Sequence, residues 1–161
     1  MTLVILNRQR TKKIATRQLR RIVRELLAAL TIDSAELGIN LVAAREMTLL
    51  NETFLRHGGS TDVITFNHGP LANSQSSAGA GLHGELFVCV DEAIVQAKRF
   101  RGTWEAEVVR YIVHGVLHLI GHDDVSAGKR QRMKREENRL VRRLGGKFSF
   151  AELSRTAKIR A

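Results

Sequence analysis

A chain of 161 residues, 43% of them hydrophobic, has the length of one domain and enough apolar content for a core of its own. Its net charge of +10 favours an acidic partner, such as a polyphosphate chain, over a cationic one. The single cysteine, Cys89, excludes an internal disulfide, and the sequence has no apolar run long enough to cross a membrane. We therefore expect a cytoplasmic protein with no membrane partner.

Strands and helices alternate along the sequence, which predicts an α+β fold: a small mixed β-sheet packed with about five helices. In chain order we expect a strand over residues 3–6, a helix over 14–30, a strand over 38–43, a helix over 45–55 and a strand over 63–66. Next we expect a Gly- and Ser-rich loop over 67–84, a strand over 85–90 and a helix that Asp91 opens as its cap. The last two elements are a helix over 104–120 and a helix over 126–144.

Capping residues mark the ends of the last two predicted helices. Thr103 precedes one and Ser126 the other, and Gly145 with Gly146 is expected to end the second. Residues 1–146 then form a single domain. Residues 147–161 are a basic tail with little periodicity, which is typical of a disordered end.

Basic residues are concentrated at the two ends of the chain. Residues 1–30 hold eight Lys or Arg against one Glu, and residues 125–161 hold twelve against three acidic residues. Residues 31–124 hold six against twelve. Such ends are typical of a surface that binds a phosphate backbone, although basic helix faces are often only solvated. An acidic membrane is less favoured, because no stretch joins a basic face to a Trp- and Phe-rich one.

The segment from His114 to Asp124 is typical of a metal site. His114 and His118 are four residues apart, so a helix places both imidazoles on one face. Gly121 lets the chain leave that helix and fold back, so that Asp124 supplies a third ligand. Three protein ligands with a fourth position left for water are the layout of a catalytic zinc site, whereas a structural site is usually closed by four ligands, mostly cysteine. The site is thus expected on a buried central helix and the turn that follows it.

Two alternatives remain open at this point. The helix over 104–120 is apolar on nearly every side, so its histidines are either ligands or buried core residues, and burying unligated imidazoles is costly. His122 is a rival of Asp124 for the third ligand. Asp124 is favoured because His122 directly follows the glycine and has less chain with which to turn back. Asp123 is expected to support an imidazole from outside the ligand set.

A metal held in this way assists hydrolysis at a carbonyl or a phosphoryl group. The peptide hydrolases called zincins carry H-E-x-x-H, in which a glutamate beside the first histidine is the general base. Gly115 stands at that position here. The missing base makes a peptide hydrolase the less favoured alternative, and the basic ends of the chain favour a phosphodiester.

Three segments, in this order, resemble the endoribonuclease YbeY family of rRNA maturation factors. The first is Asn51-Glu-Thr-Phe54-Leu-Arg56-His57 with Thr61-Asp62-Val-Ile-Thr65-Phe66, the second is Gly84-Glu85-Leu-Phe-Val-Cys-Val, and the third is the histidine motif. Roughly residues 38–145 are covered.

This resemblance implies a metal-dependent, zinc-containing endoribonuclease for single strands that acts in rRNA maturation and ribosome quality control. Its partners would be RNA, the ribosomal subunit and ribosome-associated proteins. One zinc ion would be held by His114, His118 and Asp124, and the two histidines would also count as catalytic. The alternative is a non-enzymatic ribosome assembly factor in which the metal stabilises the fold.

The sequence departs from the family pattern at the third ligand and at an arginine. Most members have histidine where this chain has Asp124, and tyrosine where it has His122. The family's arginine falls on Leu55, so the adjacent Arg56 is the candidate for holding the scissile phosphate and stabilising developing charge. Asp62 is expected either to shape the cleft or to cap a turn.

Overall fold

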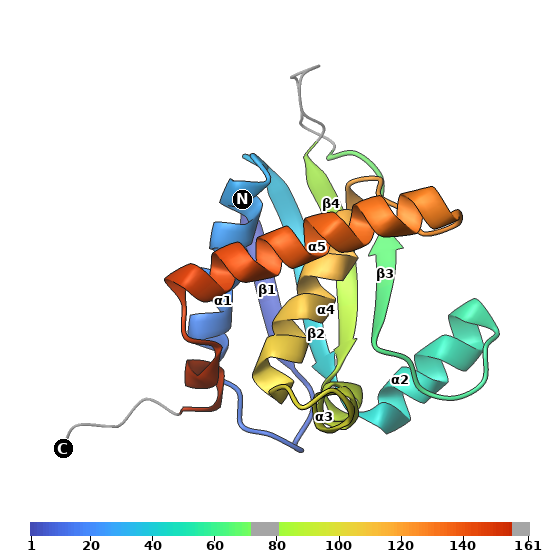
Figure 1. Ribbon diagram of the computed structural model, residues 1–161. Coiled ribbons are helices and arrows are strands. Elements are labelled where there is room, and N and C mark those ends of the chain that lie inside the picture. The colour runs from blue at the N-terminus through green and yellow to red at the C-terminus, as the bar shows by residue number, and fades with distance from the viewer. Residues whose placement is uncertain (72–80, 156–161) are drawn as a thin grey trace.

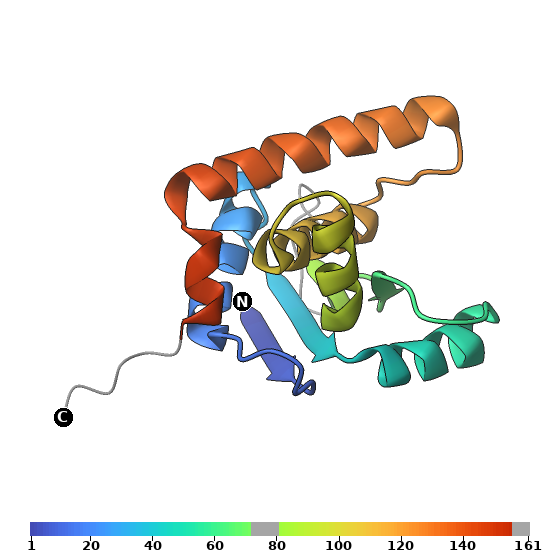
Figure 2. The ribbon, with the colours of Figure 1, turned by 60° about the horizontal axis from the view of Figure 1, so that its bottom comes forward.

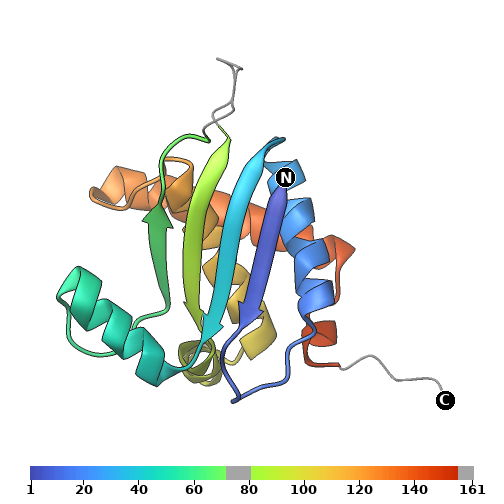
Figure 3. The ribbon, with the colours of Figure 1, turned by 180° about the vertical axis from the view of Figure 1, so that it is seen from behind.

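A four-stranded sheet forms the centre of the computed structural model, which describes residues 1–71 and 81–155. Its strands are β1 (Thr2–Asn7), β2 (Ala35–Val42), β3 (Val63–Asn67) and β4 (Leu82–Cys89). They lie in the order β1-β2-β4-β3, with β1, β2 and β4 parallel and β3 antiparallel to β4 at the edge. The expected mixed sheet is confirmed (Figure 3).

Five α-helices accompany the sheet: α1 (Thr16–Ala29), α2 (Ala44–Leu50), α3 (Val90–Arg99), α4 (Trp104–Leu119) and α5 (Ala127–Lys147). A π-helical turn (Asn51–Leu55) extends α2, and a 3-10 turn (Phe150–Ser154) follows α5. Figures 1 and 3 show α1, α4 and α5 on one face of the sheet. The α+β fold with about five helices is therefore confirmed. Across the described residues, no helix combines the length and the apolar character needed to span a bilayer.

The central position of α4 follows from its composition. Every second residue of β4, including Leu82, Leu86 and Val88, is buried on the helical side of the sheet. Against this surface lies α4, with α5 on its other side (Figures 1 and 2). A helix covered on both sides must be apolar nearly all round, and the buried residues of α4 include Val108, Val109, Ile112, Val113, Val116 and Leu117. The helix that carries the two histidines is therefore held firmly by packing.

The caps of α4 and α5 agree with the sequence. The Thr103 hydroxyl accepts a hydrogen bond from the third amide after it at 3.3 Å, and the Ser126 hydroxyl does the same at 3.2 Å. The expected stop at Gly145 and Gly146 is wrong, because α5 continues to Lys147. Neither glycine adopts a left-handed conformation there, so both remain ordinary helical residues.

Asp91 is not the cap of α3. Its carboxylate accepts hydrogen bonds from the Ala44 amide at 2.7 Å and from the Thr11 hydroxyl at 2.7 Å. Asp91 therefore provides a hydrogen-bond acceptor for a backbone amide at the start of α2. It also links the segments that contain Thr11 and Ala44 to the first turn of α3. These donors are 47 and 80 residues away in sequence, so local pattern could not reveal the contact.

The two segments expected to be irregular are described only in part. Of the loop over 67–84, residues 72–80 lie outside the described residues. Of the tail over 147–161, residues 156–161 also lie outside them. In the described part of the tail, Leu153 is fully buried, and its carbonyl accepts a hydrogen bond from the Ala15 amide at 2.7 Å. Residues as far as Ser154 thus pack on the domain.

Candidate metal centre

Three potential ligands converge where α4 ends. The Nε2 atoms of His114 and His118, on successive turns of α4, are 3.1 Å apart. One ligand atom from each histidine and a carboxylate oxygen of Asp124 all lie within 4.8 Å of one another. Because these three atoms lie so close together, the group could hold a single metal ion.

The turn after α4 brings Asp124 back to the histidines. Gly121 has a φ of +104°, in the left-handed region that a residue with a Cβ rarely adopts. The Gly121 amide donates to the His118 carbonyl at 3.1 Å, and the His122 amide donates to the Leu117 carbonyl at 3.0 Å. These bonds reverse the chain, as glycine commonly does at a helix end. Asp124 then lies beside the last turn of the helix that it has just left.

Its neighbours in the turn face elsewhere. His122 lines a separate cavity on the outer side of α5. The Asp123 carboxylate accepts a hydrogen bond from the Val125 amide at 3.2 Å and pairs with Lys129 at 3.4 Å. Within the described residues, Asp123 makes no hydrogen bond or ion pair with either imidazole of the cluster, so the expected support by Asp123 is wrong.

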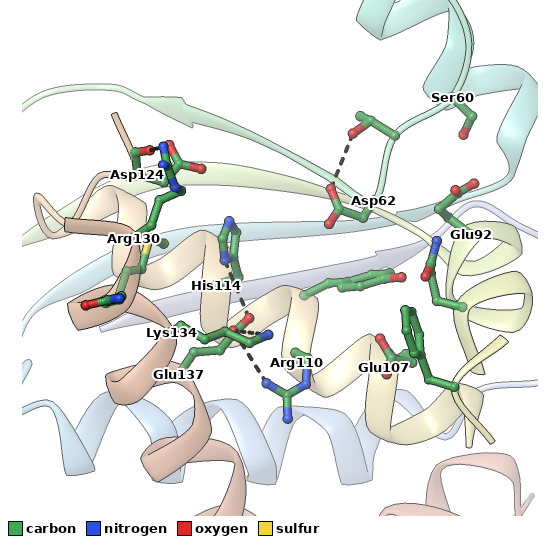
Figure 4. Close-up of a pocket in the computed structure, with 16 residues that line it drawn as sticks. Ser60, Asp62, Glu92, Glu107, Arg110, His114, Asp124, Arg130, Lys134 and Glu137 are labelled. Atoms are coloured by element: carbon green, nitrogen blue, oxygen red, sulfur yellow. Dashed lines mark hydrogen bonds and ion pairs between the residues drawn. The ribbon is translucent and has the colours of Figure 1, made fainter. Parts of the chain in front are cut away.

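Glu137 of α5 occupies the supporting position instead. Its carboxylate is nearly buried, with 6% of the side chain exposed, and lies 3.5 Å from Nδ1 of His114. The same carboxylate also forms ion pairs with Arg110 at 3.4 Å and with Lys134 at 3.2 Å (Figure 4). Burial opposes ionisation of Glu137, but the His114 hydrogen bond and the charge of Lys134 outweigh it and lower the pKa. An ionised carboxylate on Nδ1 leaves Nε2 free to bind a metal.

The electrostatics of His118 suit a ligand. Burial and the adjacent His114 imidazole lower the pKa of His118 below its usual value. A neutral imidazole is the form that binds metals, so little deprotonation is needed at neutral pH. The donor set is two imidazole nitrogens and one carboxylate, which fits a first-row divalent ion such as zinc.

We expect Glu137→Gln to weaken metal binding by about 10- to 100-fold, the usual effect of losing a carboxylate behind a ligating imidazole. The measurement is a competition titration with a fluorescent chelator. Glu136→Gln is the matched control, because it removes the same charge one residue away, from a side chain that pairs with Arg139 on the outer surface. Equal affinities in the two variants would contradict this role for Glu137.

A cavity of about 900 Å³ adjoins the cluster on the inner side of α5. His114 and Asp124 line it together with two cations of α5, Arg130 and Lys134 (Figure 4). Acidic and polar side chains from α3, α4 and the segment before β3 also line it: Ser60, Thr61, Asp62, Glu92, Gln96 and Glu107. Both cations and carboxylates therefore lie beside the potential ligands, since Asp62 also lines a small cavity together with them.

Tyr111 is a buried polar residue in the wall of this cavity. Only 5% of it is exposed, and no hydrogen-bond partner for its hydroxyl is found among the described residues. Burial and the nearby carboxylates of Glu107 and Asp62 raise the pKa of Tyr111 far above its usual value, so the hydroxyl stays protonated.

Removing that hydroxyl should stabilise the protein, because a buried polar group without a partner costs about 1–3 kcal/mol. We expect Tyr111→Phe to raise the free energy of unfolding by an amount in that range, measured by urea denaturation. Destabilisation by a similar amount would mean that a bound molecule or ordered water satisfies the hydroxyl.

The structure does not bring Arg56 to the cluster. Leu55, the residue that matches the family's arginine position, lines a small cavity together with the three potential ligands. Arg56 is exposed at the end of the π-helical turn, with a φ of +55°. The Asp62 carboxylate accepts from the Val63 amide at 2.8 Å and also lines the cavities beside His114.

Three residues near the cluster were missed from the sequence: Glu137, Arg130 and Lys134. Glu137 did carry a signal, since it interrupts the apolar stripe of α5 formed by Met133, Leu140 and Leu144. A charge on a buried stripe usually has a partner. The two cations carried none, because α5 is basic over most of its exposed surface.

The fold and the cluster together define a class of protein: an α+β domain whose central helix and following turn present three potential metal ligands beside an open cavity. A family model described as Endoribonuclease YbeY matches residues 4–145. The chain therefore belongs to the endoribonuclease YbeY family, which confirms the resemblance seen in the sequence.

Two relatives agree with this assignment, and a solved structure shows the same fold. An Endoribonuclease YbeY from Chlorobium phaeovibrioides is 37% identical over 124 residues, which are 77% of this chain and 75% of the relative. One from Salinibacter ruber is 32% identical over 125 residues, 76% of this chain and 79% of the relative. The solution structure of a Thermotoga maritima protein shares the fold, with a TM-score of 0.65 and 23% identity over 99% of this chain and 100% of that one.

Proposed function

We propose that this protein is a zinc-dependent endoribonuclease that cleaves single-stranded RNA during rRNA maturation and ribosome quality control. The single observation that carries the proposal is the cluster of His114, His118 and Asp124, which opens toward a cavity with cations on its near wall. Membership of a family named for endoribonuclease activity supports RNA as the substrate.

The chemistry of the cluster suits hydrolysis of a phosphodiester. A divalent ion bound there would make water more acidic and would polarise a phosphoryl oxygen. Neutral imidazoles and a carboxylate favour zinc, and three protein ligands leave one coordination position for solvent or substrate. On this basis we assign His114 and His118 both metal-binding and catalytic roles and Asp124 a metal-binding role.

The protein's own cations would hold the substrate. Arg130 and Lys134 line the cavity beside His114, and the Arg130 guanidinium donates to the Asp124 carbonyl at 3.1 Å, which fixes its place at the turn. Phosphate oxygens near the cluster would accept hydrogen bonds from both side chains. Arg56 remains our candidate for stabilising charge in the transition state, and this role requires its exposed side chain to reach across Leu55.

Peptide hydrolysis has less support. A Cβ atom at Gly115 would lie 2.8 Å from a methyl group of Leu86 and 3.3 Å from one of Val63, so this position faces the sheet. A glutamate there could not present a carboxylate to water near His114. The general base of H-E-x-x-H enzymes has no counterpart at this place in the fold.

Metal analysis and cleavage assays on the same purified protein test the proposal. We expect about one zinc ion per chain, cleavage of single-stranded rRNA fragments, loss of cleavage with a chelator and its return when zinc is restored. Absence of cleavage by fully zinc-loaded protein that still binds rRNA would favour the assembly factor. Such an activity in the cytoplasm would act on rRNA of the ribosomal subunit, together with ribosome-associated proteins.

A further inference from the structure

A second cavity, of about 590 Å³, lies on the outer side of α5, away from the three potential metal ligands. Four arginines of α5 and one histidine of the preceding turn line it: Arg132, Arg135, Arg139, Arg142 and His122. We call this surface the arginine groove. The arginines are three, four and three residues apart, so they share one face of the helix. Figure 2 shows α5 along the outer edge of the molecule, so this face is open to a large partner.

The positive charge of the groove is mostly unneutralised. Of the described residues that line it, only Glu136 carries a carboxylate, and Glu136 pairs with Arg139. Among the described residues, no carboxylate oxygen lies within the 4.0 Å of an ion pair from the guanidinium groups of Arg132, Arg135 or Arg142. Like charges three and four residues apart repel each other and destabilise an isolated helix. The arrangement therefore does not serve the stability of α5, which points to an anionic partner.

The turn that supplies Asp124 also connects the two sides of α5. Asp124 lies beside His114 and His118, whereas His122, two residues earlier, lines the groove. A smaller cavity of about 330 Å³ continues from the groove along this turn, with His122 and Arg132 common to both and Lys129 on its wall. Asp123 also lines the smaller cavity and pairs with Lys129, so the unneutralised positive charge begins at Arg132 and runs outward along α5.

We propose that the arginine groove binds consecutive phosphates of the RNA strand on one side of the scissile bond. This inference rests on the proposed function and names a surface for the substrate beyond the cluster. Arg132 and Arg142 are ten residues apart, a distance of about 15 Å along a helix, so the groove spans more than one phosphate of an extended strand. Guanidinium groups bind phosphate oxygens in pairs, and such contacts position a strand without reading its sequence.

The test compares two double variants that remove equal charge. Arg132→Gln with Arg139→Gln alters the groove, and Arg17→Gln with Arg24→Gln alters two exposed arginines of α1. Binding of a short fluorescein-labelled 2′-O-methyl RNA strand to the zinc-loaded protein is measured by anisotropy over a range of salt concentrations. The groove variant should bind several-fold more weakly, and its salt slope should be smaller by about 1.4, since each phosphate contact on a single strand contributes about 0.7. The α1 variant should resemble the wild type.

Cleavage kinetics separate this proposal from the proposed function. The groove variant should show a raised KM for single-stranded RNA with kcat nearly unchanged, because His114, His118 and Asp124 are all intact. Equal weakening of RNA binding in both double variants would overturn the proposal, since net charge alone would then explain it. Unchanged RNA binding in the groove variant would also overturn it. An acidic protein would then be the partner that the charge of the groove favours. If the wild type cleaves no RNA but the binding difference holds, the groove survives and the nuclease does not.

Discussion

His118→Ala should abolish RNA cleavage while leaving RNA binding largely intact. His118 supplies one of the two facing Nε2 atoms, so its loss leaves one imidazole and a carboxylate for the ion. Loss of a residue that only supports a metal ligand typically lowers metal affinity by about 10- to 100-fold. Loss of His118, a potential ligand itself, should lower metal affinity by more than this. The arginine groove lies on the other side of α5 and keeps its charge. Metal content, cleavage rate and salt-dependent RNA binding, measured on one preparation, check the result.

Asp124→His is the companion variant. It restores the commoner form of the family motif at the third ligand and should retain both zinc and part of the activity, because histidine also binds zinc.

A folded His118→Ala protein that has lost its metal and still cleaves RNA at the original rate would contradict the role of the cluster. Arg56→Ala should lower kcat more than it weakens binding if the guanidinium acts chiefly in the transition state.

Gly115→Glu should prevent folding, although it recreates the histidine-helix motif of a peptide hydrolase. A Cβ at this position already lies 2.8 Å from Leu86, whose side chain is fully buried. A carboxylate placed there would lose its hydration without gaining a partner, at a cost of several kcal/mol. Since a whole domain is stable by about 5–15 kcal/mol, this cost is a large part of the total. The measurements are soluble yield and the presence of a cooperative thermal transition.

Gly128→Glu is the matched control for that substitution. Gly128 is in the first turn of α5, is exposed, and an added Cβ would meet nothing within 4 Å. A glutamate there interacts favourably with the positive end of the helix dipole and replaces a poor helix former. Its stability should equal or slightly exceed that of the wild type. A folded Gly115→Glu protein with peptidase activity would show that position 115 reaches the cluster after all.

The site was predictable from the sequence where its residues are neighbours along the chain. The spacing of His114 and His118, followed by Gly121, predicts a shared helix face and a reversal that brings the next polar residues back toward the histidines. The structure then places Asp124 with the histidines and His122 at a separate cavity. The helix itself was predictable because α4 is apolar on nearly every side, as only a helix covered on two sides can be.

The remaining features depend on how distant elements pack together. Glu137 meets His114 only because α5 lies across α4, and Asp91 caps α2 only because the start of α3 meets it. The exposure of Arg56 depends on a left-handed backbone conformation at the end of a π-helical turn, which sequence spacing does not determine. Gly145 and Gly146 were misjudged for a related reason, because glycine permits the end of a helix without requiring it.

The region from His114 to Glu137 contains all three potential ligands, the turn between them and the carboxylate behind His114. This region is a helical hairpin, and contacts between such close neighbours along a chain form with little loss of loop entropy. The opposite wall of the cavity comes from residues 60–62 and from α3, which are much farther away in sequence. The half of the site that contains the potential ligands should therefore assemble early in folding, and the far wall should follow when the sheet closes. Because the two halves are built from separate segments, a substitution in the far wall should leave the arrangement of the three potential ligands unchanged.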